Sequence, residues 1–170
     1  MSEFTKRYLD FCKPFIASIK GVYTTMLNNE LNHGRPEIKK HNKTYGEYSA
    51  IMGINGVFDN EGQTKNFKGS LILSWGMDAY LKVASEMLME EYTEFSDEIN
   101  DVGLEICNIC MGNAKKELNK QGYKIEMSTP TLVMGKDVEL KTQKSVISIV
   151  TPMTSEIGEV HVELNYEDFE

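Results

Sequence analysis

The sequence predicts a domain that mixes helices and strands, an α/β (α+β) class of fold. Apolar residues recur at helical spacing in some segments and alternate with polar residues in others, so both kinds of element are present. The 170 residues are enough to bury a sizeable core. No linker rich in Pro, Gly or Ser divides the chain, and we therefore expect residues 1–170 to form a single domain.

The first part of the chain is predicted to hold one helix and a hairpin. Residues 5–29 have apolar side chains at helical spacing, and Pro14 should kink this helix or shift its start. Residues 30–46 are polar and contain Gly and Pro, which is typical of a long loop. Segments 48–59 and 66–76 read as strands, and the turn sequence "NEGQTK" between them predicts a hairpin.

Two helices are expected next. Residues 77–91 are amphipathic. Ser96 is a plausible N-cap for the following helix, because acidic residues stand directly after it, where the helix dipole favours them. This helix should run to about Asn119, with Gly122 as a stop signal. The carboxylate-rich stretch 86–101 is predicted to be a solvated connector, although it could also meet basic residues of a partner.

Three strands are predicted to complete the domain, at residues 129–137, 144–153 and 159–168. The full order is helix, two strands, two helices, three strands. The sequence contains no clear repeat. Both halves nevertheless begin with a helix and continue with strands, which suggests an internal two-fold architecture.

Composition excludes several classes of function. The formal net charge is -8, which argues against nucleic acid or an anionic membrane as the main partner. No run of about 18 apolar residues exists to span a membrane. The N-terminus lacks the apolar core of a signal peptide, so we expect a cytoplasmic protein. Three cysteines in apolar segments do not suggest a disulfide framework.

Cysteine and histidine residues do not form a recognisable site. Cys107 and Cys110 have a CxxC spacing, but a structural metal site needs four ligands and no second pair exists. A redox pair normally sits at the start of a helix, whereas this one is in the middle. We expect core cysteines. We expect His33 and His41 to be solvated in their polar loop and His161 to be hydrogen-bonded within its strand, without catalytic roles.

A narrow polar stripe runs along the helix predicted after Ser96. On a wheel of about 100° per residue with Asp101 at zero, Glu105 lies at about 40°, Asn108 at about -20° and Gly112 at about 20°. Asparagine is unfavourable inside a helix, and glycine costs about 1 kcal/mol relative to alanine. Apolar residues flank the stripe on both sides: Leu104, Cys107, Met111, Ala114 and Leu118 on one, and Val102, Ile106 and Ile109 on the other.

We interpret this pattern as a helix that packs on both flanks and leaves the stripe accessible. The spacing alone also allows a simpler interpretation. Glu105 and Asn108 would then be ordinary exposed residues, and Gly112 would serve close packing.

The stripe has a known counterpart. Asp101-x3-Glu105-x2-Asn108, followed by Pro130 at the start of the next strand, resembles the Asp/Ser-x3-Glu-x2-Asn…Pro signature of the CheC/CheX/FliY family of chemotaxis phosphatases. The resemblance extends over roughly residues 45–165 in the order of elements. It is carried by "GSLILSWGMDAYLKVASEMLM" and "DEINDVGLEICNICMG", which look like CheX. It implies an antiparallel-rich sheet with long helices packed on one side, in a pseudo-two-fold arrangement.

The resemblance also implies a function. Members of this family hydrolyse the aspartyl phosphate of CheY-type response regulators. Glu105 would bind the active-site lysine of the regulator, and Asn108 would enter its acidic pocket and orient the attacking water. An amide suits this role because it both donates and accepts hydrogen bonds and does not titrate. Pro130 would shape the adjacent turn, while Asp101 and Gly112 would contact the partner or support the site.

Cofactors and partners follow from the same resemblance. We expect no cofactor in this chain, Mg²⁺ on the phosphorylated CheY-type regulator, and a homodimer paired through sheet edges. One site per chain is expected, as in CheX and not CheC, because the first helix region offers only Glu30 and His33 in "ELNHG".

Two other functions remain open. The main alternative is a non-catalytic binding or dimerisation module of a two-component signalling or flagellar motor complex. A small-molecule or metal enzyme is a third class, against which the lack of clustered ligands counts.

Overall fold

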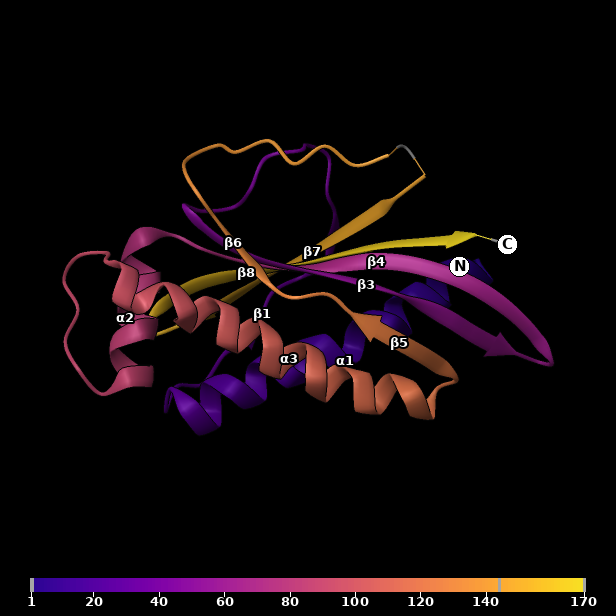
Figure 1. Cartoon of the computed structure of the whole chain (residues 1–170), viewed down its shortest axis with the longest axis horizontal. Coiled ribbons are helices and arrows are strands. Elements are labelled where there is room, and N and C mark those ends of the chain that lie inside the picture. Colours follow the sequence, from indigo (N-terminus) through magenta and orange to yellow (C-terminus); the bar gives the residue numbers. More distant parts are fainter. Residues whose placement is uncertain (1, 144, 170) are drawn as a thin grey trace.

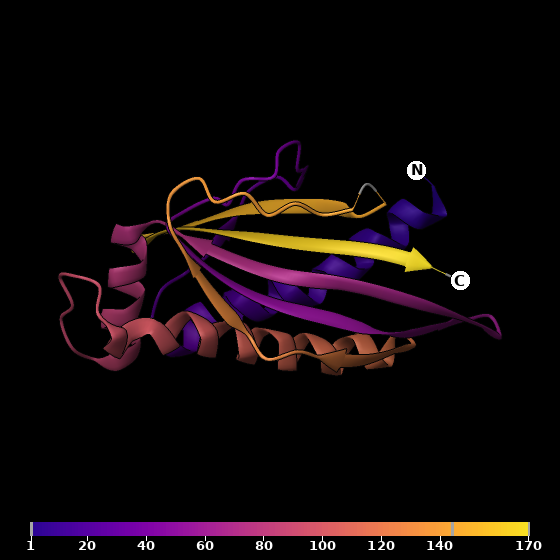
Figure 2. The ribbon, with the colours of Figure 1, turned by 45° about the horizontal axis from the view of Figure 1, so that its top comes forward.

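Two long helices cover one face of a twisted sheet, and irregular segments cross the other face (Figure 1, Figure 2). This arrangement comes from a computed structural model that describes residues 2–143 and 145–169. The elements in chain order are α1 (Glu3–Met26), β1 (Asn32–His33), β2 (Glu37–Ile38), β3 (Tyr48–Asn60), β4 (Gln63–Trp75), α2 (Met77–Leu88), the 3-10 turn η1 (Asp97–Ile99), α3 (Asn100–Lys120), β5 (Tyr123–Met127), β6 (Thr131–Met134), β7 (Ile147–Ser155) and β8 (Gly158–Phe169).

The described strands form one antiparallel sheet of eight, which confirms the predicted fold class. The order along it is β1-β7-β8-β4-β3-β5, with β2 also paired to β7 and β6 also paired to β3. Each half therefore consists of a long helix, two short edge strands and a long hairpin. The edge strands of each half pair with the hairpin of the other half. The predicted pseudo-two-fold relates the halves about a line between β4 and β8.

The central hairpin was predicted correctly, and its strands extend closer to the turn than predicted. β3 and β4 pair without interruption from Tyr48 opposite Trp75 to Asn60 opposite Gln63. The two turn residues, Glu61 and Gly62, have φ angles of 50° and 81°. Two successive positive φ angles suit the right-handed twist of a hairpin, and glycine adopts them at little cost.

The core lies between the sheet and helices α1 and α3. Phe11 of α1 is its aromatic centre and is fully buried. Burying one such side chain stabilises the fold by about 1.5–3 kcal/mol. Its ring centroid lies 5.3 Å from that of Phe15, 5.4 Å from Tyr123 and 4.9 Å from Tyr166.

Of the two effects predicted for Pro14, a kink or a shifted start, the shifted start is wrong. Helix α1 begins at Glu3 and runs through Pro14 to Met26, so the proline neither ends the helix nor sets its start. A proline inside a helix removes one hydrogen bond. The buried side chains on both sides of it, Phe11, Phe15 and Ile19, offset that loss by packing in the core.

Two predictions about strands need correction. Residues 30–46 are not entirely a loop, because β1 and β2 each pair with β7 over two residues. Four strands follow α3 instead of three, since β5 at Tyr123–Met127 pairs with β3. The strands β1 and β2 have two residues each, too few to show the alternation by which a sequence indicates a strand. β5 does alternate, with Tyr123 and Ile125 buried, so the sequence carried a signal for it that was missed.

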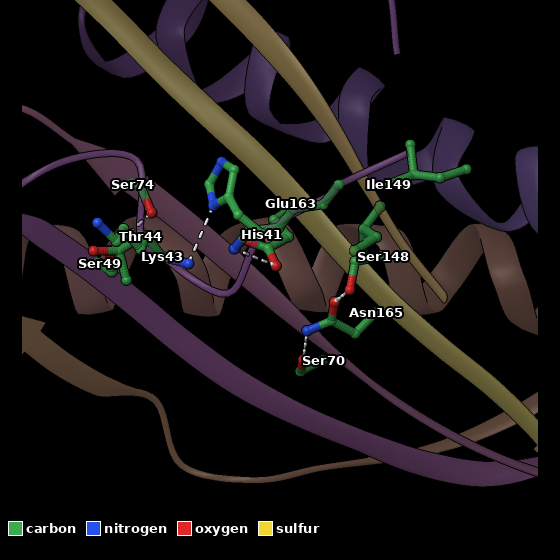
Figure 3. A network of polar contacts seen from close by, with 12 residues as sticks. His41, Lys43, Thr44, Ser49, Ser70, Ser74, Ser148, Ile149, Glu163 and Asn165 are labelled. Atoms are coloured by element: carbon green, nitrogen blue, oxygen red, sulfur yellow. Dashed lines mark hydrogen bonds and ion pairs between the residues drawn. The ribbon is translucent and has the colours of Figure 1, made fainter. Parts of the chain in front are cut away.

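The sheet face turned away from α1 and α3 is polar (Figure 3). The buried side chain of Asn165 accepts a hydrogen bond from Ser148 and donates one to Ser70 at 2.8 Å, which links β7, β8 and β4. Lys39, just after β2, forms an ion pair with Glu163 of β8 at 2.9 Å, and their side chains are only 4% and 5% exposed. These contacts hold the segment around β2 against the sheet.

Candidate active site

Helix α3 is fixed at its N-terminal end by a buried tyrosine of α2. The hydroxyl of Tyr80 donates to the carbonyl of Ile99 at 2.8 Å and accepts from the backbone N–H of Gly103 at 3.0 Å. Burial raises the pKa of Tyr80 to about 12, and the nearby negative charge of Asp101 acts in the same direction. Tyr80 was not identified from the sequence, because nothing in the spacing of the segment 77–91 separates it from an ordinary core residue.

The prediction that Ser96 caps this helix is wrong, because the N-cap residue of α3 is Ile99. Ser96 caps the 3-10 turn η1, which leads directly into α3, yet its side chain makes no capping hydrogen bond. The acidic residues after it, Asp97 and Glu98, stand in the first turn as predicted. The carboxylates of the connector 86–101 are exposed, as expected of a solvated segment.

Both flanks of α3 are packed, which confirms the predicted narrow stripe. The Cys107 sulfur lies 4.0 Å from the carbonyl oxygen of Ala50 in β3, and the Cys110 sulfur lies 3.5 Å from that of Phe15 in α1. The two cysteines therefore point to different neighbours. Both are buried and free, and burial raises the pKa of the Cys110 thiol to about 12. They are core residues, as the sequence predicts.

Asp101, Glu105 and Asn108 lie along the exposed line between these flanks. Residues three and four apart on a helix are surface neighbours, so the carboxylate of Glu105 and the amide of Asn108 stand side by side. Within the described part of the chain, neither side chain has a hydrogen-bond or ion-pair partner. The pair presents an anionic acceptor beside a neutral group that donates and accepts, and both are available to another molecule.

The other two predicted site residues lie in different surroundings. Gly112 continues the line one turn after Asn108 and is half-buried. Pro130 is half-buried in the connection between β5 and β6, and both of these strands contact α3. The structure thus brings four of the five predicted residues onto one helix, with Pro130 in the chain segment that borders it.

The main cavity of the outer sheet face lies elsewhere. It has a volume of about 590 Å³, and its lining includes Gly53, Ser70 and Asn165 but neither Glu105 nor Asn108. The exposed pair on α3 therefore lies outside this cavity.

The described residues lack the features of a metal site and of a membrane-spanning helix. In residues 2–143 and 145–169, no three His, Cys, Asp or Glu side chains are placed to hold a metal ion together. None of the helices in these ranges is long and apolar enough to cross a bilayer.

Comparison with known proteins identifies relatives over most of this chain. The model of a family described as chemotaxis phosphatase CheX matches residues 48–154. The CheY-P phosphatase CheX of Thermotoga maritima is 27% identical over 145 residues, which cover 82% of this chain and 87% of that protein. The crystal structure of chemotaxis protein CheX from Vibrio vulnificus is 28% identical, with a TM-score of 0.79 over 93% of this chain and 99% of the other.

A relative has also been crystallised in a complex. The CheX–CheY–BeF₃–Mg²⁺ complex of Borrelia burgdorferi contains a chain that is 24% identical to this one. It covers 94% of this chain and 98% of its own length with a TM-score of 0.70, which shows the same fold.

Proposed function

This chain belongs to the CheX family of chemotaxis phosphatases, and we propose that it hydrolyses the aspartyl phosphate of a phosphorylated CheY-type response regulator. The observation that carries this proposal is the pair Glu105 and Asn108. Both side chains are exposed, adjacent and without partners in the described chain, on a helix whose flanks are buried. The curated relative is named as a CheY-P phosphatase, which supports the same substrate class.

The proposed mechanism inserts one face of α3 into the active site of the regulator. Glu105 binds the active-site lysine of the regulator, which fixes the orientation of the helix. Asn108 then holds a water in line with the bond between phosphorus and the aspartyl oxygen. Hydrolysis of an acyl phosphate needs this alignment together with neutralised charge on the phosphoryl group. Correct positioning of the reactants can remove several kcal/mol from the barrier.

The regulator supplies the remaining groups in this proposal. Mg²⁺ accompanies CheY and BeF₃ in the Borrelia burgdorferi complex, and we place the metal ion on the regulator. A cation there neutralises the phosphoryl oxygens, so this chain contributes only a positioned water and an anchor. Asp101 would add negative charge near the N-terminal end of α3. Pro130 would shape the connection between β5 and β6, which borders this helix.

The proposal is tested by the lifetime of a phosphorylated CheY-type regulator in the presence of this protein. Wild type shortens the lifetime, and Asn108→Ala loses about 100-fold or more of the acceleration, as when one transition-state hydrogen-bonding group is removed. Asn113→Ala is the matched control, because Asn113 is an exposed asparagine of the same helix that lies off the stripe. It should retain full activity.

If wild type leaves the lifetime of every regulator unchanged, the phosphatase proposal is wrong. The non-catalytic binding module is then the better description, and binding without hydrolysis would identify it. The expected homodimer and the single domain over residues 1–170 stay predictions. The mass in solution and the cooperativity of unfolding test them.

A further inference from the structure

Gly112 is half-buried, yet the absence of a side chain leaves open space beside the α3 backbone, for which the described chain offers no internal reason. A Cβ atom built on Gly112 would meet no atom within 4 Å. Gly103 on the same helix is different, because its Cβ would approach a ring carbon of Tyr80 to 3.0 Å and one of Trp75 to 3.3 Å. Packing therefore explains Gly103 but not Gly112. The idea that Gly112 lets another segment of this chain approach closely is not supported.

Helix formation does not favour Gly112 either. Glycine is the least favourable residue inside a helix after proline, because it loses the most backbone freedom. Gly112 has no positive φ that would require glycine. An alanine there would fit the available space and strengthen α3.

Open space at a helical glycine is not by itself a sign of a binding site. Gly21 of α1 is also free of atoms within 4 Å of its built Cβ. It has no motif beside it, and the Thr25 hydroxyl donates to its carbonyl at 2.8 Å. Gly112 differs in its position, because it lies one turn beyond Asn108 on the line that also holds Glu105.

The asparagine side chain is short, and this makes the space beside Gly112 important for docking. The amide of Asn108 is separated from the helix backbone by a single methylene group. To bring this amide to a phosphoryl group inside another protein, the backbone of α3 must come close to the rim of that protein's pocket. Any side chain at the next turn of the same line would meet the rim first.

We propose that Gly112 is a docking position, where the bare backbone lets the phosphorylated response regulator approach α3 closely enough for Asn108 to reach its active site. This inference rests on the proposed function. It makes Gly112 a positioning residue for regulator binding and not a catalytic residue. It also assigns the direction of docking, since the regulator surface then extends from Glu105 past Asn108 toward the C-terminal half of α3.

The test compares Gly112→Ala and Gly112→Gln with Gly21→Ala and Gly21→Gln. Three quantities are measured: kcat and KM toward the phosphorylated regulator, Kd for the regulator carrying beryllofluoride, and the urea midpoint of unfolding. We expect both alanine variants to have higher midpoints than wild type. Gly112→Gln should lose about 100-fold in kcat/KM, because a misplacement of about 1 Å can cost that much, and its Kd should rise. Gly112→Ala should show a smaller loss, and both Gly21 variants none.

Two results would overturn the inference. One is equal activity and equal Kd for the Gly112 and Gly21 variants. The other is a lower urea midpoint of unfolding for Gly112→Gln than for Gly21→Gln. Unfolding would then explain the loss of activity of Gly112→Gln. If wild type binds the beryllofluoride regulator without hydrolysing phosphate, only the proposed function fails, and the Kd series still decides the role of Gly112. If wild type does not bind it, both proposals fail.

Discussion

Helices α1 and α3 occupy matching places in the two halves of the sheet, yet their exposed faces differ in chemistry. On α1, Lys13 forms an ion pair with Asp10 at 2.7 Å, and Lys20 forms a hydrogen bond with the His33 ring at 3.1 Å. On α3, Lys120 and Glu117 form a similar exposed pair at 3.0 Å, but Glu105 and Asn108 have no partner within the described chain. Both helices meet the same packing demand, which constrains only their buried faces. The outward faces are therefore free to differ, and only one of them carries the motif.

The edges of the two halves differ as well. In the second half, β5 pairs with β3 over five residues and β6 over four. In the first half, β1 and β2 pair with β7 over only two residues each, and the buried ion pair of Lys39 with Glu163 lies directly after β2. Where backbone pairing is short, a side-chain contact holds the edge in place.

Loss of the buried ion pair should have the largest effect on stability. Lys39→Met leaves the carboxylate of Glu163 buried and unpaired, which should cost about 3–5 kcal/mol of unfolding free energy. Lys13→Met breaks an exposed pair of α1, and the cost should stay below about 1 kcal/mol. Urea denaturation measures both. The double variant Lys39→Met with Glu163→Met should recover most of the loss, and equal costs for the two single variants would contradict the role of the buried pair.

Reversal of charge on the stripe tests the difference between the helix faces. In the proposed mechanism, Glu105→Lys places a cation against the regulator's lysine, and like charges across an interface are strongly unfavourable. We expect about a 100-fold loss in kcat/KM, equivalent to about 2.7 kcal/mol. Glu117→Lys reverses an exposed charge of α3 away from the stripe and should change kcat/KM little. Similar losses for the two variants would show that overall charge, not the stripe, governs activity.

Replacement of the three helical glycines by alanine should change the free energy of unfolding in different directions. Gly103→Ala pushes a methyl group against Tyr80 and should destabilise by about 1–3 kcal/mol. Gly21→Ala and Gly112→Ala should each stabilise by up to about 1 kcal/mol, because alanine favours the helix and no atom opposes it. Urea midpoints of the three variants provide the measurement. A destabilised Gly112→Ala would indicate an internal contact at that position.

The smallest expected effect concerns His161 on the outer sheet face. Burial lowers its pKa below the ordinary value of 6.5, although Glu159 opposes this. The unfolded chain therefore binds the proton more readily than the folded one, and the stability that neutral His161 provides is lost as the pH falls below 6.5. Stability measured against pH should fall more steeply for wild type than for His161→Gln. Equal dependence of stability on pH for the two proteins would contradict this role of His161.

Patterns within one element were enough to predict much of this protein. The helical spacing of Tyr8, Phe11 and Phe15, and the alternation on both sides of Glu61 and Gly62, depend on whether each residue is buried or exposed. Burial on one face of a helix or strand produces a periodic pattern of apolar residues in the sequence. The polar stripe on α3 was predicted for the same reason, because Glu105 and Asn108 interrupt a surface that is apolar on both sides.

The tertiary structure alone decided the contacts between distant segments. The strands β1 and β2 exist because the longer strand β7 offers backbone groups to pair with, and their two-residue sequences are too short to predict a strand. Tyr80 fixes the start of α3 through hydrogen bonds to Ile99 and Gly103 that no spacing predicts. The sequence by itself determined which residues are buried and which line of α3 is polar. The three-dimensional fold determined that this line remains exposed and, at Gly112, bare, because only packing decides which surfaces of a helix are covered.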